Sequence, residues 1–388
     1  MVDSTTGQED MMIEISLCMI VRNEENSLPR CLSTVSAIAD EIIIVDTGST
    51  DGTKAAASAF GAVLYDFTWI DDFSAARNFA FSKATKEYIL WLDADDYLKE
   101  EDQQRFIRLK SNMPEGIDSV NMQYNLGFDA AGNVTASLRR NRLVRRSCNF
   151  KWIGPVHEYL EVHGPSLSSD VCITHEKDKA YTDRNLRIYQ KRAEAGEQFT
   201  PRDQYYFANE LRDHGRFEEA SGYYEQFLDG GRGWVEDNIQ ACLKLAECRE
   251  RLGENGAAFA ALCRTLQYDQ PRAEFCCRLG AWHLDKGQLQ TAAYWYELAV
   301  MLPRNRESMA IRNEAYSTWL PHLQLALCYD RLGQPEKANQ YNETALLSHP
   351  THPSMLYNRN YFQNLLGDRY IRLQSPEAAE DGPASPQD

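Results

Sequence analysis

The first half of the chain alternates apolar runs of strand length with segments whose apolar residues recur at helical spacing. The apolar runs cover residues 15–21, 41–46, 62–67 and 88–93, and the helical patterns cover residues 26–39, 50–61 and 72–84. Near-continuous apolar strands that alternate with helices indicate a parallel sheet covered by helices on both faces. The sequence therefore predicts an α/β fold for this half.

Polar clusters follow three of the four predicted strands. They read "VRNEE", "DTGSTDGT" and "DADD". Ligands of parallel sheets bind beyond the carboxyl ends of the strands, so we expect the three clusters to meet at one edge and to form a binding site there.

The last of these clusters places Asp93, Asp95 and Asp96 directly after an apolar strand. Carboxylates this close repel one another and raise one another's pKa, and a divalent cation offsets that repulsion. The cluster therefore predicts a Mg²⁺ or Mn²⁺ site. Asp51 and Asp96 also precede helical patterns, where Asp commonly caps the helix, and we expect capping to be their main role.

Further strands follow the acidic cluster. Residues 117–128 and 134–144 read as strands, and the segments 150–162 and 170–181 continue the same half. Arg142 is a candidate partner for a diphosphate. The arginines that crowd the same strand are predicted to be solvated charges at a sheet edge: Arg139, Arg140, Arg145 and Arg146.

The C-terminal half repeats a helix–turn–helix pattern with a period near 34 residues. Four glycines fall in matching turns, namely Gly215, Gly253, Gly287 and Gly333. An alanine lies five residues after each glycine, and an alanine or glycine lies seven residues before it. Small residues at fixed offsets let two antiparallel helices approach closely, as in tetratricopeptide repeats. The longest spacing predicts an insertion at residues 304–319.

Composition narrows the classes of function. The chain has 388 residues, enough for two domains, and a formal charge of -16, which disfavours nucleic acid as a partner. Its ten cysteines form no CxxC pair, which fits a reducing, cytoplasmic setting. The sequence shows no signal peptide pattern and no apolar run long enough to span a membrane.

Four motifs, in this order, resemble the nucleotide-sugar-binding half of the inverting glycosyltransferases of family 2, GT-A type: "SLCMIVRNEE", "IIIVDTGSTDGT", "DFSAARNFA" and "ILWLDADD". The resemblance implies a Rossmann-like mixed sheet with helices on both faces, over residues 14–180. We expect a flexible N-terminus (1–13), a linking helix (181–200), all-α tetratricopeptide-like repeats (201–373) and a disordered tail (374–388).

The resemblance also implies roles for single residues. Those expected to bind the nucleotide sugar are Val21, Arg22, Asn23, Glu24, Asp46, Thr47, Arg77, Asp93 and Ala94. Many family members carry Asp at the position of Thr47, so this chain departs from the pattern there. Asp95 would ligate the metal ion, with Asp93 beside it and His175 as a third ligand.

An inverting transfer needs a base that takes the proton of the acceptor. Glu158 is the first candidate and Asp96 the second, and His157 would orient the acceptor or contact the diphosphate. A structural role, as an ordinary hydrogen-bonded side chain, is the alternative for each histidine.

A GT-A domain joined to tetratricopeptide repeats resembles the bacterial peptide glycosyltransferases of the glycocin (sublancin) type. This resemblance implies transfer from a nucleotide diphosphate sugar, such as a UDP-sugar, to a Cys, Ser or Thr side chain of a peptide or protein. The repeats would bind the acceptor or form a homodimer. Two alternatives stay open: a glucosyltransferase that extends lipopolysaccharide cores or other glycans, and a repeat adaptor with an inactive transferase domain.

Overall fold

The computed structural model describes residues 12–129, 132, 134–176, 182–303 and 312–373. The described chain forms two compact units, the first with residues 12–127, 137–176 and 182–237 and the second with residues 128–129, 132, 134–136, 238–303 and 312–373. The predicted start of the repeats at residue 201 lies inside the first unit. The N-terminal segment 1–11 and the tail 374–388 lie outside the described residues.

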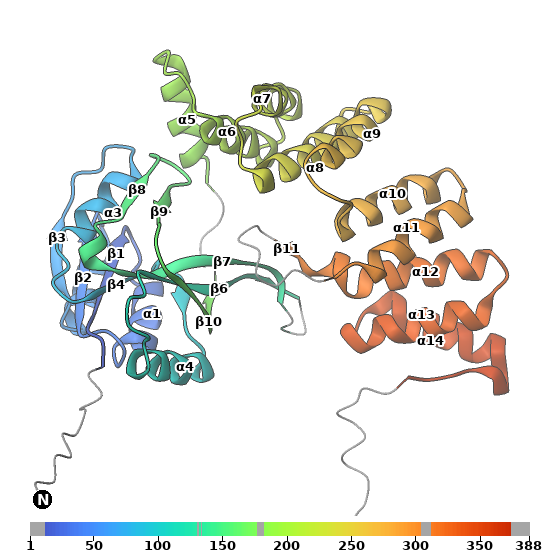
Figure 1. Cartoon of the computed structure of the whole chain (residues 1–388), viewed down its shortest axis with the longest axis horizontal. Coiled ribbons are helices and arrows are strands. Elements are labelled where there is room, and N and C mark those ends of the chain that lie inside the picture. The colour runs from blue at the N-terminus through green and yellow to red at the C-terminus, as the bar shows by residue number, and fades with distance from the viewer. Residues whose placement is uncertain (1–11, 130–131, 133, 177–181, 304–311, 374–388) are drawn as a thin grey trace, which may run out of the picture. The chain divides into compact units, whose positions relative to one another are not determined.

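Four parallel strands form one side of the sheet in the first unit (Figure 1). In spatial order they are β3 (Val63–Asp66), β2 (Glu41–Asp46), β1 (Ile15–Val21) and β4 (Tyr88–Trp91). Their pairing is parallel throughout, with Ser16 opposite Glu41 and Ile89. The predicted parallel sheet is confirmed.

Helices cover both faces of these strands. α1 (Ser27–Val35), α2 (Thr53–Ala59) and α4 (Glu100–Ser111) contribute to the apolar core that contains Ile42 and Ile44. α3 (Phe73–Phe81) contributes Ala80 to a second core, which contains Ile43 and Val45. Successive residues of a strand point to opposite faces, so a run such as "IIIV" is apolar throughout because both faces are covered.

The sheet continues beyond β4 through β7 (Val134–Arg145), β6 (Ser119–Phe128), β10 (Ser166–His175) and β5 (Asp96–Tyr97). β4 pairs with β7 antiparallel, and β5 pairs with β10 antiparallel. β7 therefore lies inside the sheet, and the prediction of an arginine-rich edge strand is wrong. Arg139 and Arg142 are buried, because β10 and β4 supply carbonyl acceptors for their guanidinium groups.

The strand path curls back on itself at the acidic cluster. β4 and β5 are four strand positions apart, which corresponds to roughly 19 Å in a flat sheet. β4 ends at Trp91 and β5 begins at Asp96. The five peptide units between these two residues reach roughly 18 Å when fully extended. A turn shortens this segment further, because Asp96 N donates to the carbonyl oxygen of Asp93 at 3.0 Å. The sheet must therefore bend, and the acidic cluster lies where it closes.

A hairpin and three helices complete the first unit. β8 (Lys151–Ile153) pairs with β9 (Tyr159–Glu161), and the 3-10 turn Arg146–Cys148 precedes them. The helices are α5 (Arg184–Glu194), α6 (Pro201–Asp213) and α7 (Phe217–Gly230). The loop between β8 and β9 carries positive φ angles at Gly154 (98°) and His157 (51°).

Paired helices make up the rest of the described chain. They are α8 (Val235–Arg251), α9 (Asn255–Arg264), α10 (Ala273–Asp285), α11 (Leu289–Met301), α12 (Trp319–Arg331), α13 (Pro335–Ser348) and α14 (Pro353–Leu366). Short elements join them: the 3-10 turns Thr265–Gln267, Glu314–Ser317 and Gly367–Arg369, and β11 (Arg312–Asn313). Most of the predicted insertion, residues 304–311, lies outside the described residues.

The repeat pattern of the sequence is confirmed at its glycines and small residues. Each of the four glycines lies in a helix–helix turn with φ between 70° and 77°. The small residues at fixed offsets are all buried at the helix contacts: Ala208, Ala220, Ala246, Ala258, Gly280, Ala292, Ala326 and Ala338. A Cβ atom at Gly280 would lie 2.7 Å from the ring of Tyr296, so this helix pair requires glycine. No described helix has both the length and the apolar character that a membrane span requires.

Candidate active site

A cavity of about 320 Å³ opens at the carboxyl ends of the parallel strands in the first unit. Eleven residues that the sequence proposed for the site line it: Val21, Arg22, Glu24, Thr47, Arg77, Asp93, Ala94, Asp95, His157, Glu158 and His175. They come from segments up to 154 residues apart in the sequence. The expectation that the polar clusters meet at one edge of the sheet holds for these residues.

Two proposed residues, Asn23 and Asp46, are absent from the cavity lining and hold the loops that follow β1 and β2. The side-chain oxygen of Asn23 accepts from Thr50 N at 2.8 Å. Asp46 is 1% exposed, and its Oδ1 accepts from the backbone amides of Gly48 and Ser49 at 2.9 and 2.8 Å. Its Oδ2 is buried without a hydrogen-bond partner among the described residues.

Asp51 lies one residue before Gly52, the N-cap residue of α2, so the predicted cap is not Asp51 itself. Its Oδ1 accepts from Thr53 N at the first turn of α2, and its Oδ2 accepts from Glu25 N. These bonds lower the pKa of Asp51, although desolvation opposes them. Asp51 therefore belongs to the scaffold of the loop.

Arg77 connects two carboxylates across the cavity. Its Nε donates to Glu158 Oε1 at 2.6 Å, and one terminal nitrogen donates to Asp93 Oδ1 at 2.7 Å. The rings of Trp91 and Trp152 flank the guanidinium carbon at 5.0 and 4.8 Å. Arg77 therefore joins α3, the acidic turn and the β8–β9 loop through one buried planar group.

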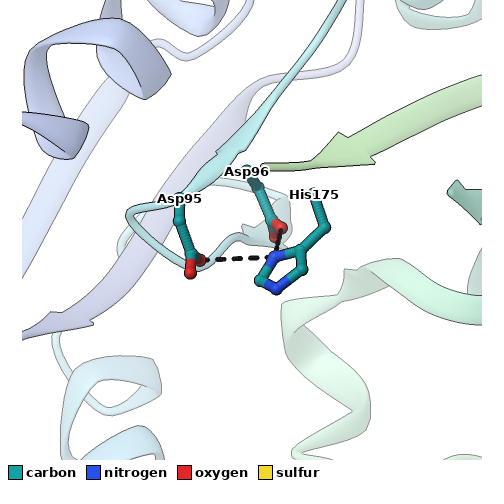
Figure 2. Close-up of side chains that lie close together, drawn as sticks. All are labelled: Asp95, Asp96 and His175. Atoms are coloured by element: carbon teal, nitrogen blue, oxygen red, sulfur yellow. Dashed lines mark hydrogen bonds and ion pairs between the residues drawn. The ribbon is translucent and has the colours of Figure 1, made fainter. Parts of the chain in front are cut away.

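A group of three metal-ligating side chains lies beside this arginine: Asp95, Asp96 and His175 (Figure 2). Nδ1 of His175 lies 3.4 Å from Asp95 Oδ1 and 3.2 Å from Asp96 Oδ1. One ligand atom from each residue falls within 4.8 Å of the other two, the only such group among the described residues. The sequence proposed Asp93 in place of Asp96, whereas the structure pairs Asp93 with Arg77.

The surroundings shift the pKa values of these groups in different directions. Burial, together with the charges of Asp93 and Asp96, raises the pKa of Asp95 to about 6, against the effect of His175. Burial opposes ionisation of Asp93 as well, but Arg77 and Arg142 outweigh it and hold the pKa of Asp93 well below its usual range. Two carboxylates in one turn thus differ in their ease of protonation.

Asp96 does not cap α4, so the expectation of a capping role is wrong. α4 begins after Lys99, whereas the Asp96 carboxylate is completely buried between β5, β6 and β7. It accepts from Tyr124 OH at 2.8 Å and pairs with Arg142 NH1 at 3.1 Å. Asp96 turns inward because the bend of the sheet brings it against β7.

The β8–β9 loop places the proposed catalytic pair on one wall of the cavity. Glu158 faces Arg77, as described above. His157 Nε2 contacts Glu210 Oε1 of α6 at 2.7 Å, and its ring stacks on Tyr206 at 4.4 Å. The sequence proposed both Glu158 and His157 for the site.

Other lining residues were missed by the sequence analysis: Trp69, Phe73, Arg140, Arg184 and Asn185. The guanidinium of Arg184 lies 4.6 Å from the ring of Phe73. Within the part of the chain that the structure describes, no carboxylate lies within ion-pair distance of Arg140 or Arg184. The one available signal for Arg184 was its position at the start of the helix after the last strand.

Comparison with known proteins identifies the family. The model described as "Glycosyl transferase family 2" matches residues 16–213, just over half of the chain. The chain belongs to glycosyl transferase family 2. The match covers β1 to α6, so it includes every cavity-lining residue of this family 2 chain.

Two relatives and one solved structure resemble the chain. A TPR repeat-containing protein of Synechococcus elongatus is 42% identical over 150 residues, which is 39% of this chain and 36% of the relative. The glycosyltransferase SunS of Bacillus subtilis is 27% identical over 254 residues, 60% of this chain and 59% of the relative. The structure of glucosyl-3-phosphoglycerate synthase from Mycobacterium tuberculosis, solved with Mn²⁺ and UDP-glucose, is 13% identical at a TM-score of 0.34. The match covers 49% of this chain and 81% of the synthase chain. The family 2 chain thus spans less than two thirds of both relatives.

Proposed function

We propose that the protein is a metal-dependent inverting glycosyltransferase that moves a sugar from a nucleotide diphosphate sugar to a Cys, Ser or Thr side chain of a peptide or protein. The observation that carries this proposal is the cavity at the strand ends. It combines the acidic turn Asp93–Asp95 with Arg140 and Arg184, neither of which forms an ion pair within 4.0 Å among the described residues. Guanidinium groups that form no ion pair with a carboxylate suit an anionic ligand such as a diphosphate.

The residues of the acidic turn fit a hard divalent cation. Asp95 and Asp96 offer oxygen atoms and His175 a nitrogen, all within 4.8 Å of one another. Carboxylate oxygens are the ligands that Mg²⁺ and Mn²⁺ favour. When bound, the cation would stabilise negative charge on the departing diphosphate.

The transfer replaces one bond to the anomeric carbon by another. The acceptor oxygen or sulfur forms a bond to this carbon, and the bond from the carbon to the diphosphate oxygen breaks on the opposite face. The nucleoside diphosphate leaves with the bonding electrons, and the acceptor proton passes to a base. Glu158 is the proposed base because its carboxylate lines the cavity.

A peptide or protein acceptor is supported by two features. The motifs of the first half, joined to helical repeats, resemble peptide glycosyltransferases, and stacked helix pairs offer extended surfaces for peptide binding. The chain also aligns with the glycosyltransferase SunS over 254 residues, well beyond the GT-A part.

The test is release of nucleoside diphosphate from a panel of UDP- and GDP-sugars with Mg²⁺ or Mn²⁺. We expect slow hydrolysis of one donor that stops with a chelator. Asp95→Ala should lower the rate at least about a hundredfold, the scale of an electrostatic contribution to the transition state. Asp51→Asn is the matched control, since Asp51 holds a neighbouring loop and should stay within about threefold of wild type.

Donor hydrolysis that is identical in Asp95→Ala and wild type would contradict the proposed site. If the protein neither binds a donor nor releases nucleoside diphosphate with any metal, the enzymatic function is contradicted. That result would favour the repeat adaptor. An active donor then allows a search for acceptors, in which peptides with Cys, Ser or Thr are compared with glycan acceptors.

A further inference from the structure

The helix α6, the first helix of the repeat pattern, contacts His157, the residue that precedes Glu158 in the β8–β9 loop. It contacts His157 at three separate points within the first unit. Glu210 Oε1 lies 2.7 Å from His157 Nε2, and the Tyr206 ring stacks on the imidazole at 4.4 Å and 17°. Arg202 donates to the carbonyl oxygen of His157 through Nε at 3.1 Å and through NH2 at 2.9 Å.

The backbone at this point needs outside support. His157 has φ of 51°, in the left-handed region, and side chains with a Cβ atom adopt it at an energetic cost. The loop residues 154–158 have no regular strand pairing of their own. The contacts from α6 fix ring, carbonyl and backbone of His157 together, so they also fix the direction in which the chain leaves toward Glu158.

The carboxylate of Glu210 is shielded from solvent and contacts the β8–β9 loop. Glu210 is 2% exposed, and the same Oε1 also accepts from Asn185 Nδ2 at 3.2 Å. His157 and Asn185 both line the cavity. A buried carboxylate that receives hydrogen bonds from two side chains of one cavity wall orients both of them.

The contacts continue from the loop to the acidic turn. Glu158 accepts from Arg77, and Arg77 donates in turn to Asp93. Each link is a direct hydrogen bond between buried or half-buried groups. The position of α6 is therefore transmitted to Glu158 through the contacts on His157 and the peptide bond between these two residues, and from Glu158 to Arg77 and Asp93 through two hydrogen bonds.

We infer that α6 is an integral part of the active site, with Arg202, Tyr206 and Glu210 as positioning residues for Glu158. This inference rests on the proposed function. The first helix of the repeat pattern thus serves the chemical step. Its displacement by a fraction of an ångström would misplace the base, and a misplacement of about 1 Å can lower a rate by roughly a hundredfold.

The experiment measures donor hydrolysis of Glu210→Ala, with Glu343→Ala as the matched control. Glu343 is a completely buried carboxylate of α13 that accepts from Arg359 at 2.9 and 2.6 Å and lines no part of the cavity. Glu210→Ala should lower kcat roughly tenfold to a hundredfold and leave KM for the donor within about twofold. Glu343→Ala should reduce stability and leave kcat unchanged.

A conservative variant and a double mutant sharpen the test. Glu210→Gln keeps an oxygen acceptor for His157 and should recover most of kcat. The double variant of His157→Ala and Glu210→Ala should be about as slow as either single variant, because both remove the same contact. If Glu210→Ala does not fold, Arg202→Met removes a contact to the same loop from a half-buried position and should show the same loss of kcat.

Amide hydrogen exchange of residues 154–158 separates this inference from the proposed function. Faster exchange in Glu210→Ala than in Glu343→Ala supports the positioning role, even where wild type hydrolyses no donor and the proposed function fails. Exchange and kcat that match those of Glu343→Ala would overturn the inference, as would fully additive effects in the double variant.

Discussion

Arg142 and Asp96 form an ion pair in which both side chains are completely buried. The guanidinium carbon of Arg142 also lies 3.9 Å from the Trp91 ring and 4.3 Å from the Tyr124 ring. Arg142→Met should lower the free energy of unfolding by about 3–5 kcal/mol, because it leaves the Asp96 carboxylate buried without its cation. Urea denaturation measures this loss.

Arg146→Met is the control for this prediction. Arg146 follows the same strand, is exposed, and donates from Nε to the carbonyl oxygen of Lys86. Replacing Arg146 should lower the free energy of unfolding by less than about 1 kcal/mol. Equal losses in the two variants would show that the buried pair contributes nothing beyond an ordinary surface contact.

At the scale of residues, the sequence predicts the metal-binding and acidic groups of the site. It does not predict which of these groups form ion pairs with one another. The motif "LDADD" predicts a metal-binding turn, and Asp95 and His175 lie together as proposed. Yet Asp93 and Asp96 have the same side chain and lie three residues apart, and one pairs with Arg77 while the other pairs with Arg142. This choice depends on the bend of the sheet, which no local pattern encodes.

At the scale of elements, the helix pair α10–α11 depends on a glycine in a helix. Gly280→Ala would place a Cβ atom 2.7 Å from the Tyr296 ring. This overpacking should lower the free energy of unfolding by about 1–3 kcal/mol. Gly222→Ala is the control. Gly222 lies within α7 with open space around it, so alanine should stabilise the protein by about 0.5–1 kcal/mol. Thermal unfolding of both variants should therefore shift in opposite directions.

The start of α6 gives a prediction on pH. Asp203 forms a capping box with Thr200 and pairs with Arg192 at 2.6 Å. Burial raises the pKa of Asp203, but Arg192 and Thr200 outweigh it and hold the pKa below its ordinary value of 3.8. A lowered pKa in the folded state means that this carboxylate stabilises the fold above pH 3.8, and that the contribution is lost as the pH falls through the folded-state value.

Asp203→Asn should therefore lower the free energy of unfolding by about 1–2 kcal/mol at pH 7. The difference from wild type should narrow as the pH falls below 3.8 and should vanish below the folded-state pKa of Asp203, where both side chains are neutral. Asp213→Asn, an exposed position at the end of α6, should change stability by less than about 0.5 kcal/mol throughout. A difference for Asp203→Asn that grows on acidification would contradict the assigned interactions.

Elements with strong local patterns were predicted closely. The runs 15–21 and 41–46 correspond to β1 and β2 residue for residue. The antiparallel pairing of β5 with β10 was not predicted, since β5 has only two residues and their partners are 77 and 79 residues away. Arg184 and Asn185 were missed for a similar reason, because tertiary packing brings α5 to the cavity.

At the scale of the whole molecule, the two compact units should respond differently to the donor nucleotide. The cavity lies entirely in the first unit. A ligand at a hundredfold excess over its dissociation constant stabilises the state that binds it by about 2.7 kcal/mol. We expect UDP or GDP with Mn²⁺ to raise the calorimetric transition of the first unit and to leave that of the second unchanged.

Asp95→Ala is the control in this calorimetric experiment, because it removes a proposed metal ligand. The ligand-induced shift should disappear in this variant. A single transition that shifts as a whole would show that the two units unfold together, and a shift confined to the second unit would contradict the proposed site.

The closure of the sheet at the acidic turn also sets an order of events during synthesis. Asp96 reaches its neighbour His175 only after 79 further residues have been added. Contacts of such long sequence separation form late and slowly, because closing a long loop costs entropy before any contact repays it. The parallel strands β1 to β4 are complete by residue 91. The nascent chain therefore exposes an apolar, half-finished sheet, and Asp95 and Asp96 lack their neighbour His175 until that residue has left the ribosome.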